Sequence, residues 1–259
     1  MKIALVQPKI FSDRTDGQLD SYRKNLEALK GMDLDLLVFP EFFSTGFYYD
    51  FDKFEEVEGM TFRWMKDLSE SLNCAVVGSV PTMLGNGSNV NRLYFVAPEI
   101  IAFYDKRHVF IGPESDSFTA GRERVIVPFR GMNILLQLCY DMRFPVWSRV
   151  KNADYDLILN VAQWPESRIS VPLKLCAARA IENQSYYVFC NWKAVIREEQ
   201  EGGCSHLVLP DGNVMEPEQV FSSEAVDFFI YDIRESLPTS VRKRFKVSRD
   251  ADDFEIKKE

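Results

Sequence analysis

The chain contains the stretch MNILLQLCYDMRFP at residues 132–145, in which an apolar run ends at a cysteine. The length and aliphatic composition of residues 132–138 predict a buried strand. The chain is expected to turn out of the sheet after Cys139, and Pro145 suits the first turn of a helix. A thiol at the carboxyl end of a core strand is held rigidly and can face a cleft.

Two more predicted strands end in a reactive side chain. Residues 34–40 lead to Glu41, and residues 100–105 lead to Lys106. Taken singly, each residue has a more common structural interpretation: a buried cysteine is a small hydrophobe, a glutamate after Phe-Pro caps a helix or lies in a loop, and a lysine at a strand end is solvated. Their joint appearance among apolar neighbours favours one site assembled from three distant segments.

A thiol, a carboxylate and an ammonium suffice for acyl transfer through a thioester. A positioned carboxylate can take the thiol proton, and an ammonium in a dry site can stabilise the oxyanion that forms when the thiolate attacks a carbonyl. The histidines, His108 and His206, lack metal-ligand partners at useful spacing, and the chain has no HExxH, GxSxG, GxGxxG or P-loop sequence. We therefore expect neither a metal nor another cofactor.

The composition predicts a folded, acidic protein. The 259 residues are 46% hydrophobic with a formal net charge of −8. Nucleic acid and anionic membranes both need basic patches, so neither is expected as a partner. The five cysteines form no CxxC pair, which argues against a disulfide scaffold. The first apolar run is too short for a signal peptide and no stretch reaches transmembrane length, so we expect a cytoplasmic protein with reduced thiols.

Helical and strand patterns alternate along the chain. Periodicity predicts helices over residues 18–30, 60–72 and 167–183, and another from about residue 145. Residues 107–123 look like a loop, and strands are predicted over residues 2–7, 34–39, 74–80, 90–96, 100–104, 124–128, 132–138, 156–161, 186–190, 204–209 and 225–231. This alternation predicts an α/β layered sandwich. No linker divides the chain, so we predict a single domain over residues 1–259, with a C-terminal extension from about residue 235.

Several sequence blocks resemble the nitrilase superfamily of carbon–nitrogen hydrolases. The blocks are FPE at residues 39–41, YDKRH at residues 104–108 and LCYDMRFP at residues 138–145, and the likeness spans about residues 2–247. The resemblance implies a four-layer αββα sandwich that pairs into an αββα–αββα homodimer. RFPVWSR at residues 143–149 and QWP at residues 163–165 are most similar to the omega-amidase branch. Those enzymes hydrolyse the terminal amide of small dicarboxylic monoamides such as 2-oxoglutaramate and 2-oxosuccinamate.

The resemblance also implies the role of each catalytic residue. Cys139 is then the nucleophile, and Glu41 is the general base that accepts its proton and later protonates the leaving ammonia. Lys106 and the backbone N–H of Tyr140 stabilise the tetrahedral oxyanion. Glu114 is the candidate for a second glutamate that positions the lysine and the substrate amide.

The residues expected to bind the substrate follow from the same resemblance. Arg143 would pair with the free carboxylate of a small carboxylated amide, although an ion pair with Asp141 or another structural acid is an equal alternative. Phe43 and Trp164 are predicted pocket walls.

The identity of the substrate stays open at this point. The segment after Asn191 departs from related enzymes, and residues 197–202 are strongly acidic. An N-carbamoyl-amide hydrolase or nitrilase of the same superfamily is one alternative, and a non-catalytic binding protein on this fold is another. A thiol redox enzyme is a further alternative, which the missing resolving-cysteine motif argues against.

Overall fold

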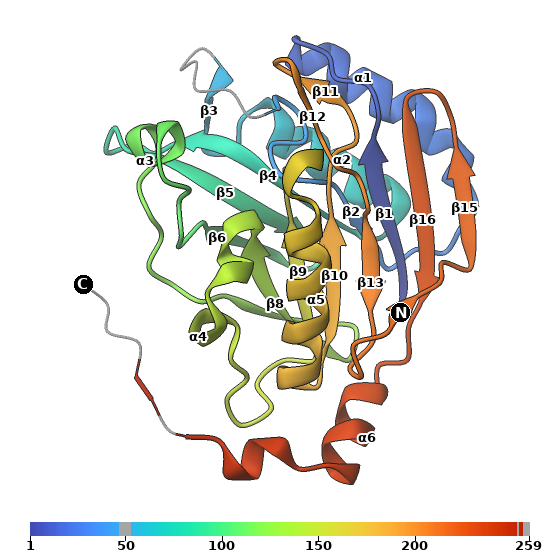
Figure 1. The fold of residues 1–259 in the computed structure, drawn as a ribbon. Helices are drawn as coiled ribbons and strands as arrows, with labels where there is room; N and C mark the ends of the chain where they lie inside the picture. Colours follow the sequence, from blue (N-terminus) through green and yellow to red (C-terminus); the bar gives the residue numbers. More distant parts are fainter. Residues whose placement is uncertain (47–52, 253, 256–259) are drawn as a thin grey trace.

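The computed structural model describes residues 1–46, 53–252 and 254–255, and it shows a mixed α/β fold with sheets flanked by helices (Figure 1). The first sheet has the strand order β15-β16-β1-β2-β4-β5-β6, with β3 beside β4. The second sheet has the order β14-β13-β10-β9-β8-β7, and β11 pairs only with β12.

The first sheet is made of β1 (Lys2–Pro8), β2 (Leu36–Val38), β3 (Glu55–Glu56), β4 (Ala75–Met83), β5 (Asn89–Val96), β6 (Ile101–Asp105), β15 (Gln219–Ser222) and β16 (Val226–Asp232). The second sheet is made of β7 (Ile126–Phe129), β8 (Met132–Leu138), β9 (Leu157–Val161), β10 (Tyr186–Cys190), β13 (His206–Val208) and β14 (Val214–Met215). A separate small hairpin is formed by β11 (Val195–Ile196) and β12 (Glu199–Gln200). The α-helices are α1 (Thr15–Asn25), α2 (Met60–Leu72), α3 (Pro113–Ser117), α4 (Pro145–Ser148), α5 (Ser170–Asn183) and α6 (Leu237–Arg244). The 3-10 helices are η1 (Leu26–Leu29), η3 (Cys139–Arg143), η4 (Glu166–Arg168) and η5 (Val247–Asp250).

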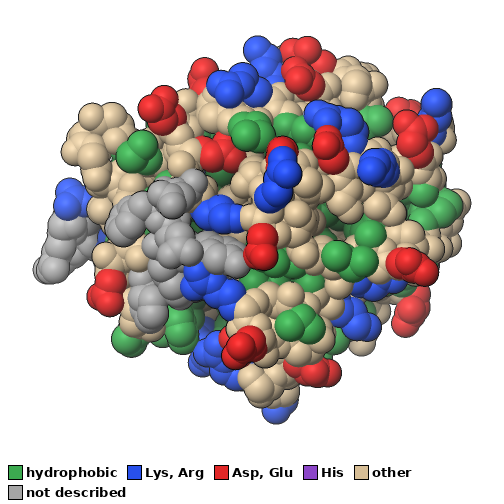
Figure 2. Space-filling view, turned by 90° about the horizontal axis from the view of Figure 1, so that it is seen from above, with side chains coloured by type: hydrophobic (Ala, Val, Ile, Leu, Met, Phe, Trp, Pro, Cys, Tyr) green, Lys and Arg blue, Asp and Glu red, His purple; other side chains and the backbone are tan. Residues whose placement is uncertain are grey.

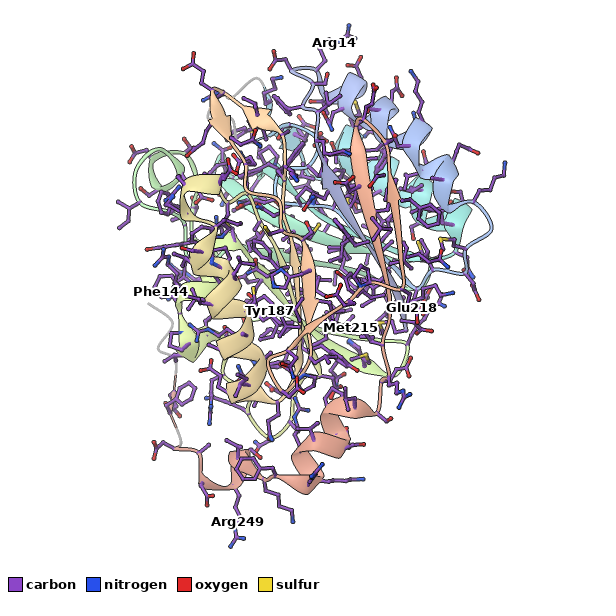
Figure 3. All side chains as sticks on the ribbon, turned by 45° about the vertical axis from the view of Figure 1, so that its right-hand side comes forward. Arg14, Phe144, Tyr187, Met215, Glu218 and Arg249 are labelled. Carbon is purple, nitrogen blue, oxygen red and sulfur yellow. The ribbon has the colours of Figure 1, made fainter. Side chains whose placement is uncertain are left out.

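Three buried apolar clusters define the layers of the molecule. One contains residues from both sheets, such as Leu36 and Leu136, and therefore lies between them. A second joins the first sheet to α1 and α2, and a third joins the second sheet to α5. Side chains fill these layers in Figure 3, where Tyr187 lies beneath α5. The order is thus helices, sheet, sheet and helix.

The sheet topology brings distant segments to one edge of the sandwich. In the first sheet β1, β2 and β4 run parallel, and in the second sheet β8, β9 and β10 run parallel. Because parallel strands of one sheet end at the same edge, the residues that follow β2 and β4 share an edge of the first sheet, and those that follow β8, β9 and β10 share an edge of the second.

The structure confirms most of the predicted elements and corrects others. The strand over residues 132–138 and the helix that begins at Pro145 are confirmed. The predicted helix over residues 18–30 was wrong in extent, because the chain forms α1 and then tightens into η1. The predicted loop over residues 107–123 contains α3, and the short strands β3, β11, β12, β14 and β15 and the helix α6 carry too little periodic pattern to be predicted.

The C-terminal segment packs against the end of the second sheet. Arg242 of α6 donates to the backbone oxygen of Tyr155 at 2.6 Å and to Asp156 Oδ1 at 3.1 Å. The labelled Arg249 of this segment lies at the bottom of the molecule in Figure 3. None of the helices in the described part of the chain combines the length and apolar character that crossing a bilayer requires.

The cysteines are all free, and most of them are buried. Cys74, Cys176 and Cys190 lie fully within the core, Cys139 is half-buried and Cys204 is exposed. Burial raises the pKa of the Cys74 thiol to about 12 and raises the pKa of the Cys176 and Cys190 thiols further. Thiols in such surroundings are inert.

Candidate active site

The three residues that the sequence places at strand ends meet in one cavity. Glu41 follows β2, Lys106 follows β6 and Cys139 follows β8 at the start of η3. All three line a cavity of about 260 Å³, a volume suited to a small ligand. The predicted assembly of the site from three distant segments is therefore what the fold produces.

Lys106 lies between two carboxylates in the interior. Its Nζ is 2.8 Å from Glu41 Oε1, 2.7 Å from Glu114 Oε1 and 3.0 Å from Glu114 Oε2. All three side chains are almost completely shielded from solvent. Buried charges are tolerated when they are paired and hydrogen-bonded, so each member of this cluster depends on the others.

Glu114 comes from α3, the short helix inside the predicted loop. Besides Lys106, its Oε2 accepts a hydrogen bond of 2.5 Å from the backbone N–H of Phe110. The structure thus brings the candidate second glutamate into direct contact with the lysine, where it fixes the position of the ammonium group.

Glu41 is oriented by several further hydrogen bonds. Asn91 Nδ2 donates to Glu41 Oε1 at 2.8 Å, and the backbone N–H of Gln163 donates to Glu41 Oε2 at 3.0 Å. Trp192 Nε1 donates to the backbone oxygen of Glu41 at 2.7 Å. Sequence reasoning missed Asn91 and Gln163. A polar side chain in the middle of the apolar strand β5 was the available signal for Asn91.

Burial and neighbouring charges shift the pKa values of Glu41, Lys106 and Cys139. Burial raises the pKa of Glu41, while the ammonium of Lys106 acts in the opposite direction. Burial also raises the pKa of the Cys139 thiol well above its usual value, and the charge of Glu41 adds to this. Burial alone would lower the pKa of Lys106, but Glu114 and Glu41 raise it well above its usual value, so the lysine stays charged.

The backbone at Cys139 has the left-handed conformation, with φ of 41°. This conformation is costly for a residue with a side chain and is found where a fold holds a functional group in a fixed direction. Cys139 Sγ is 3.9 Å from the backbone oxygen of Gln163. Tyr140 lines the cavity next to the thiol, near the start of η3, where backbone N–H groups are not used by the helix itself.

A buried hydrogen-bond network joins the segments that carry Lys106 and Cys139. Asp141 Oδ2 accepts from Tyr104 Oη at 2.7 Å and from the backbone N–H of Leu138 at 2.9 Å. Asp141 Oδ1 accepts from the backbone N–H of His108 at 3.0 Å and lies 2.7 Å from His108 Nδ1. The alternative of an Arg143–Asp141 ion pair is wrong, because His108 and Tyr104 occupy the carboxylate.

Of the two residues predicted to be pocket walls, only one lines the cavity. Trp164 lines the cavity. Phe43 does not: it is packed in the apolar cluster between the first sheet and its helices, where its ring lies 4.8 Å from that of Phe39 and 6.0 Å from that of Trp64. The prediction for Phe43 therefore needs correction, because its ring faces the helix layer rather than the cavity.

Arg143 and Arg168 both lie near the Trp164 ring. Arg143 is exposed and its guanidinium lies 5.3 Å from the Trp164 ring, but it is not among the residues that line the cavity. Arg168 of η4 does line the cavity, and sequence reasoning missed it. An arginine two residues beyond the Trp-Pro-Glu segment carries no pattern that marks a site.

The acidic segment noted in the sequence forms part of the cavity wall. Glu199 and Glu201, on and just after β12, line the cavity together with Arg197 of the same hairpin. Figure 2 views the molecule from the end that carries this hairpin and shows acidic and basic side chains interspersed over that face. Within the described residues, no group of His, Cys, Asp and Glu side chains is arranged to hold a metal ion.

Comparisons with known proteins agree with this geometry. A family model described as carbon-nitrogen hydrolase matches residues 2–231. The chain is 35% identical to the omega-amidase YafV of Escherichia coli K12, over 99% of this chain and 98% of that protein. It is 28% identical to the 2-oxoglutaramate amidase of Bacillus subtilis strain 168, over 79% of this chain and 83% of that protein.

A solved structure is similar over nearly the whole chain. The structure of XC1258 from Xanthomonas campestris, described as a CN-hydrolase superfamily protein with an arsenic adduct in the active site, has a TM-score of 0.90 and 33% identity and covers 99% of each chain. Together with the family match and the meeting of Glu41, Lys106 and Cys139 in one cavity, these similarities show that the chain belongs to the carbon-nitrogen hydrolase family.

Proposed function

We propose that this protein is an amidohydrolase that cleaves the terminal amide of small dicarboxylic monoamides of the 2-oxoglutaramate and 2-oxosuccinamate type, releasing ammonia. The observation that carries the proposal is the junction of a thiol, a carboxylate and a buried ammonium in one small cavity. The relatives named omega-amidase and 2-oxoglutaramate amidase support this substrate class.

The reaction begins with proton transfer from Cys139 to Glu41. The thiolate attacks the amide carbonyl, a carbon–sulfur bond forms, and the oxyanion is stabilised by Lys106 and by the backbone N–H of Tyr140. When the tetrahedral intermediate collapses, the carbon–nitrogen bond breaks and protonated Glu41 gives its proton to the leaving nitrogen, which departs as ammonia.

Hydrolysis of the thioester completes the cycle. Glu41 takes a proton from water, and the resulting hydroxide attacks the thioester. The carbon–sulfur bond then breaks, Glu41 returns its proton to the Cys139 thiolate, and the carboxylic acid product loses its proton to solvent. Glu114 holds Lys106 in place during both the formation and the hydrolysis of the thioester, since it contacts the ammonium with both carboxylate oxygens.

The test is ammonia release from a panel of monoamides of increasing chain length, with an N-carbamoyl amino acid and a nitrile as alternative substrates. We expect four- and five-carbon dicarboxylic monoamides to give the highest kcat/KM, and Cys139→Ala to abolish turnover while leaving the circular dichroism spectrum unchanged. Preferred turnover of the carbamoyl compound or nitrile would move the protein to another activity of the family, and turnover of none of them would favour a binding role.

A contact between Arg143 and the substrate carboxylate is also proposed, with Trp164 as a wall of the cavity beside it. The support for this proposal is that the Arg143 guanidinium lies 5.3 Å from the ring of Trp164, which itself lines the cavity. Arg143→Gln should then raise KM for carboxylated amides more than for neutral ones.

We propose further that the chain forms a single domain over residues 1–259, with an extension from about residue 235, and that it pairs into a homodimer of αββα–αββα type. Exposed apolar side chains on α4 and α5, namely Val146, Leu173 and Ile181, support a partner on that face. The free state of all five cysteines is in keeping with the cytoplasmic location that we propose.

A further inference from the structure

Arg168 is a charged residue of the cavity wall that the proposed reaction does not use. It lies on η4, it is exposed, and it lines the cavity. Among the described residues, no acid lies within ion-pair distance of its guanidinium, and no hydrogen bond uses the N–H groups of that guanidinium. A guanidinium that borders a substrate cavity in this way has several N–H donors that a ligand can use.

Two aromatic rings of the cavity wall hold the Arg168 side chain. Its guanidinium lies 5.3 Å from the centre of the Phe110 ring and 5.9 Å from the centre of the Trp164 ring. Both distances are within the range of a cation–π contact. The Phe110 ring in turn lies 5.2 Å from the ring of Tyr140, the residue that follows the nucleophile. The guanidinium is therefore fixed by side chains that also border the reacting atoms.

Trp164 relates the thiol to two arginines. It directly follows Gln163, whose backbone oxygen lies 3.9 Å from Cys139 Sγ. The Trp164 ring has the guanidinium of Arg143 at 5.3 Å and that of Arg168 at 5.9 Å. The backbone before this tryptophan thus borders the reacting sulfur, and its side chain contacts both cations. A small substrate whose amide reaches the thiol along this wall has its acidic end at the two guanidinium groups.

We propose that Arg168 recognises the group on carbon 2 of the substrate, donating to a 2-oxo oxygen while Arg143 pairs with the adjacent carboxylate. This proposal rests on the proposed amidase function, and it names Arg168 as the residue that selects amides of 2-oxo acids over amides of 2-amino acids. The oxo oxygen and the nearer carboxylate oxygen of a 2-oxo acid are acceptors on adjacent carbons, which suits the planar N–H groups of a guanidinium. A 2-amino acid has an ammonium at this carbon, which offers no acceptor and repels the guanidinium.

The experiment compares 2-oxoglutaramate, glutaramate and L-glutamine, which share chain length, carboxylate and terminal amide and differ only at carbon 2. Arg168→Met keeps an apolar side chain on the two aromatic rings and removes the charge and the donors. The ratio of kcat/KM for 2-oxoglutaramate to that for glutaramate should then fall at least about tenfold relative to the wild-type protein. The ratio of kcat/KM for L-glutamine to that for glutaramate should rise, because the repelling charge is gone.

A conservative variant separates the charge of Arg168 from its shape. Arg168→Lys keeps the positive charge but not the planar set of donors, so it should still reject L-glutamine while losing most of the preference for 2-oxoglutaramate. Arg249→Met is the matched control. It removes an exposed arginine outside the cavity lining, at the bottom of the molecule in Figure 3, and it should change neither ratio.

The outcomes separate this proposal from the function on which it rests. An Arg168→Met protein whose kcat/KM falls equally for all three amides would show that Arg168 only supports the wall, which overturns the proposal and leaves the amidase function standing. Unchanged ratios would overturn it in the same way. Loss of the preference for the oxo group in Arg143→Gln but not in Arg168→Met would assign carbon 2 to Arg143 and also overturn it. Turnover of no monoamide by the wild-type protein would remove the amidase function itself.

Discussion

At the scale of single residues, the chemistry depends on one ammonium shared by two buried acids. Glu41 and Glu114 both contact the ammonium of Lys106 and raise its pKa, so one carboxylate still pairs with Lys106 when Glu41 takes the thiol proton. Burial raises the pKa of the Cys139 thiol, which favours its protonated form, and it raises the pKa of Glu41, which makes Glu41 a stronger base for that proton.

Replacing Lys106 with arginine tests whether this point charge is required. The larger planar guanidinium cannot take the place of an ammonium between Glu41 and Glu114, and so we expect kcat to fall by about 100-fold or more. Steady-state ammonia release measures the effect, with the exposed Lys24→Arg as the matched control. Near-normal turnover by Lys106→Arg would show that the oxyanion is stabilised elsewhere.

At the scale of elements, the position of Lys106 depends on the close approach of a loop to the end of β6. The backbone N–H of Gly121 donates to the Lys106 oxygen at 2.8 Å, and a Cβ at Gly121 would lie 2.0 Å from the backbone oxygen of Asp105. Only glycine allows this contact without moving the strand end.

Gly121→Ala should therefore displace the end of β6 and, with it, the lysine. We expect a loss of about 1–3 kcal/mol in the free energy of unfolding, together with reduced kcat. Urea denaturation and ammonia release measure the two effects. Gly85→Ala, where a new Cβ meets nothing within 4 Å, is the control. Equal stability of the two variants would contradict the proposed role of the loop.

His206 on β13 makes the stability of the second sheet depend on pH. Its Nδ1 lies 2.7 Å from the backbone oxygen of Cys204, and its Nε2 is buried without a partner among the described residues. Burial lowers the pKa of this histidine below 6.5, so the unfolded chain takes up a proton more readily than the folded protein. This contribution to stability is complete above pH 6.5 and is lost as the pH falls through 6.5 toward the folded pKa.

Urea denaturation at pH 7.5 and 5.5 checks this expectation. His206→Gln should lose less stability over this interval than the wild-type protein does, by up to about 1.4 kcal/mol per pH unit. The pH dependence of the wild-type protein must be compared with that of His206→Gln. Buried acids with raised pKa values, such as Glu201, change the unfolding free energy with pH in the opposite direction in both proteins. Identical pH dependence of the two proteins would exclude His206 as the cause.

The sequence predicts those parts of the site that directly follow an apolar strand pattern in the chain. Glu41, Lys106 and Cys139 are of this kind, because a buried strand is recognisable from its own residues. The residues Arg168 and Glu201 are not, since one lies on a single 3-10 turn and the other beside a two-residue strand. The positions of these two residues depend on backbone pairing between distant segments, such as the bridge between Glu201 and Pro165. The local sequence does not indicate such pairing.

At the scale of the whole molecule, large apolar side chains of α4 and α5 are exposed on the face that we propose pairs with a second copy. Val146 is 52% and Ile181 is 53% exposed, although both are large apolar side chains. Singly exposed residues are common, but several on neighbouring helices indicate an interaction surface.

Introducing charge on this face tests the proposed homodimer. Val146→Glu and Ile181→Glu together should convert the dimer to a monomer in sedimentation velocity, because two buried carboxylates would face each other or apolar surface. Ile10→Glu, at a similarly exposed residue after β1, is the matched control. A dimer that survives the double substitution would place the interface on another face.

The distribution of the thiols gives the molecule an internal reporter of its own unfolding. In the native state only Cys139 and Cys204 are open to an alkylating reagent, whereas Cys74, Cys176 and Cys190 become reactive once the layers separate. The intact mass after a brief pulse of such a reagent would then divide a sample into molecules with at most two adducts and molecules with five. The fraction that has opened could be read in this way without a label or a spectroscopic probe.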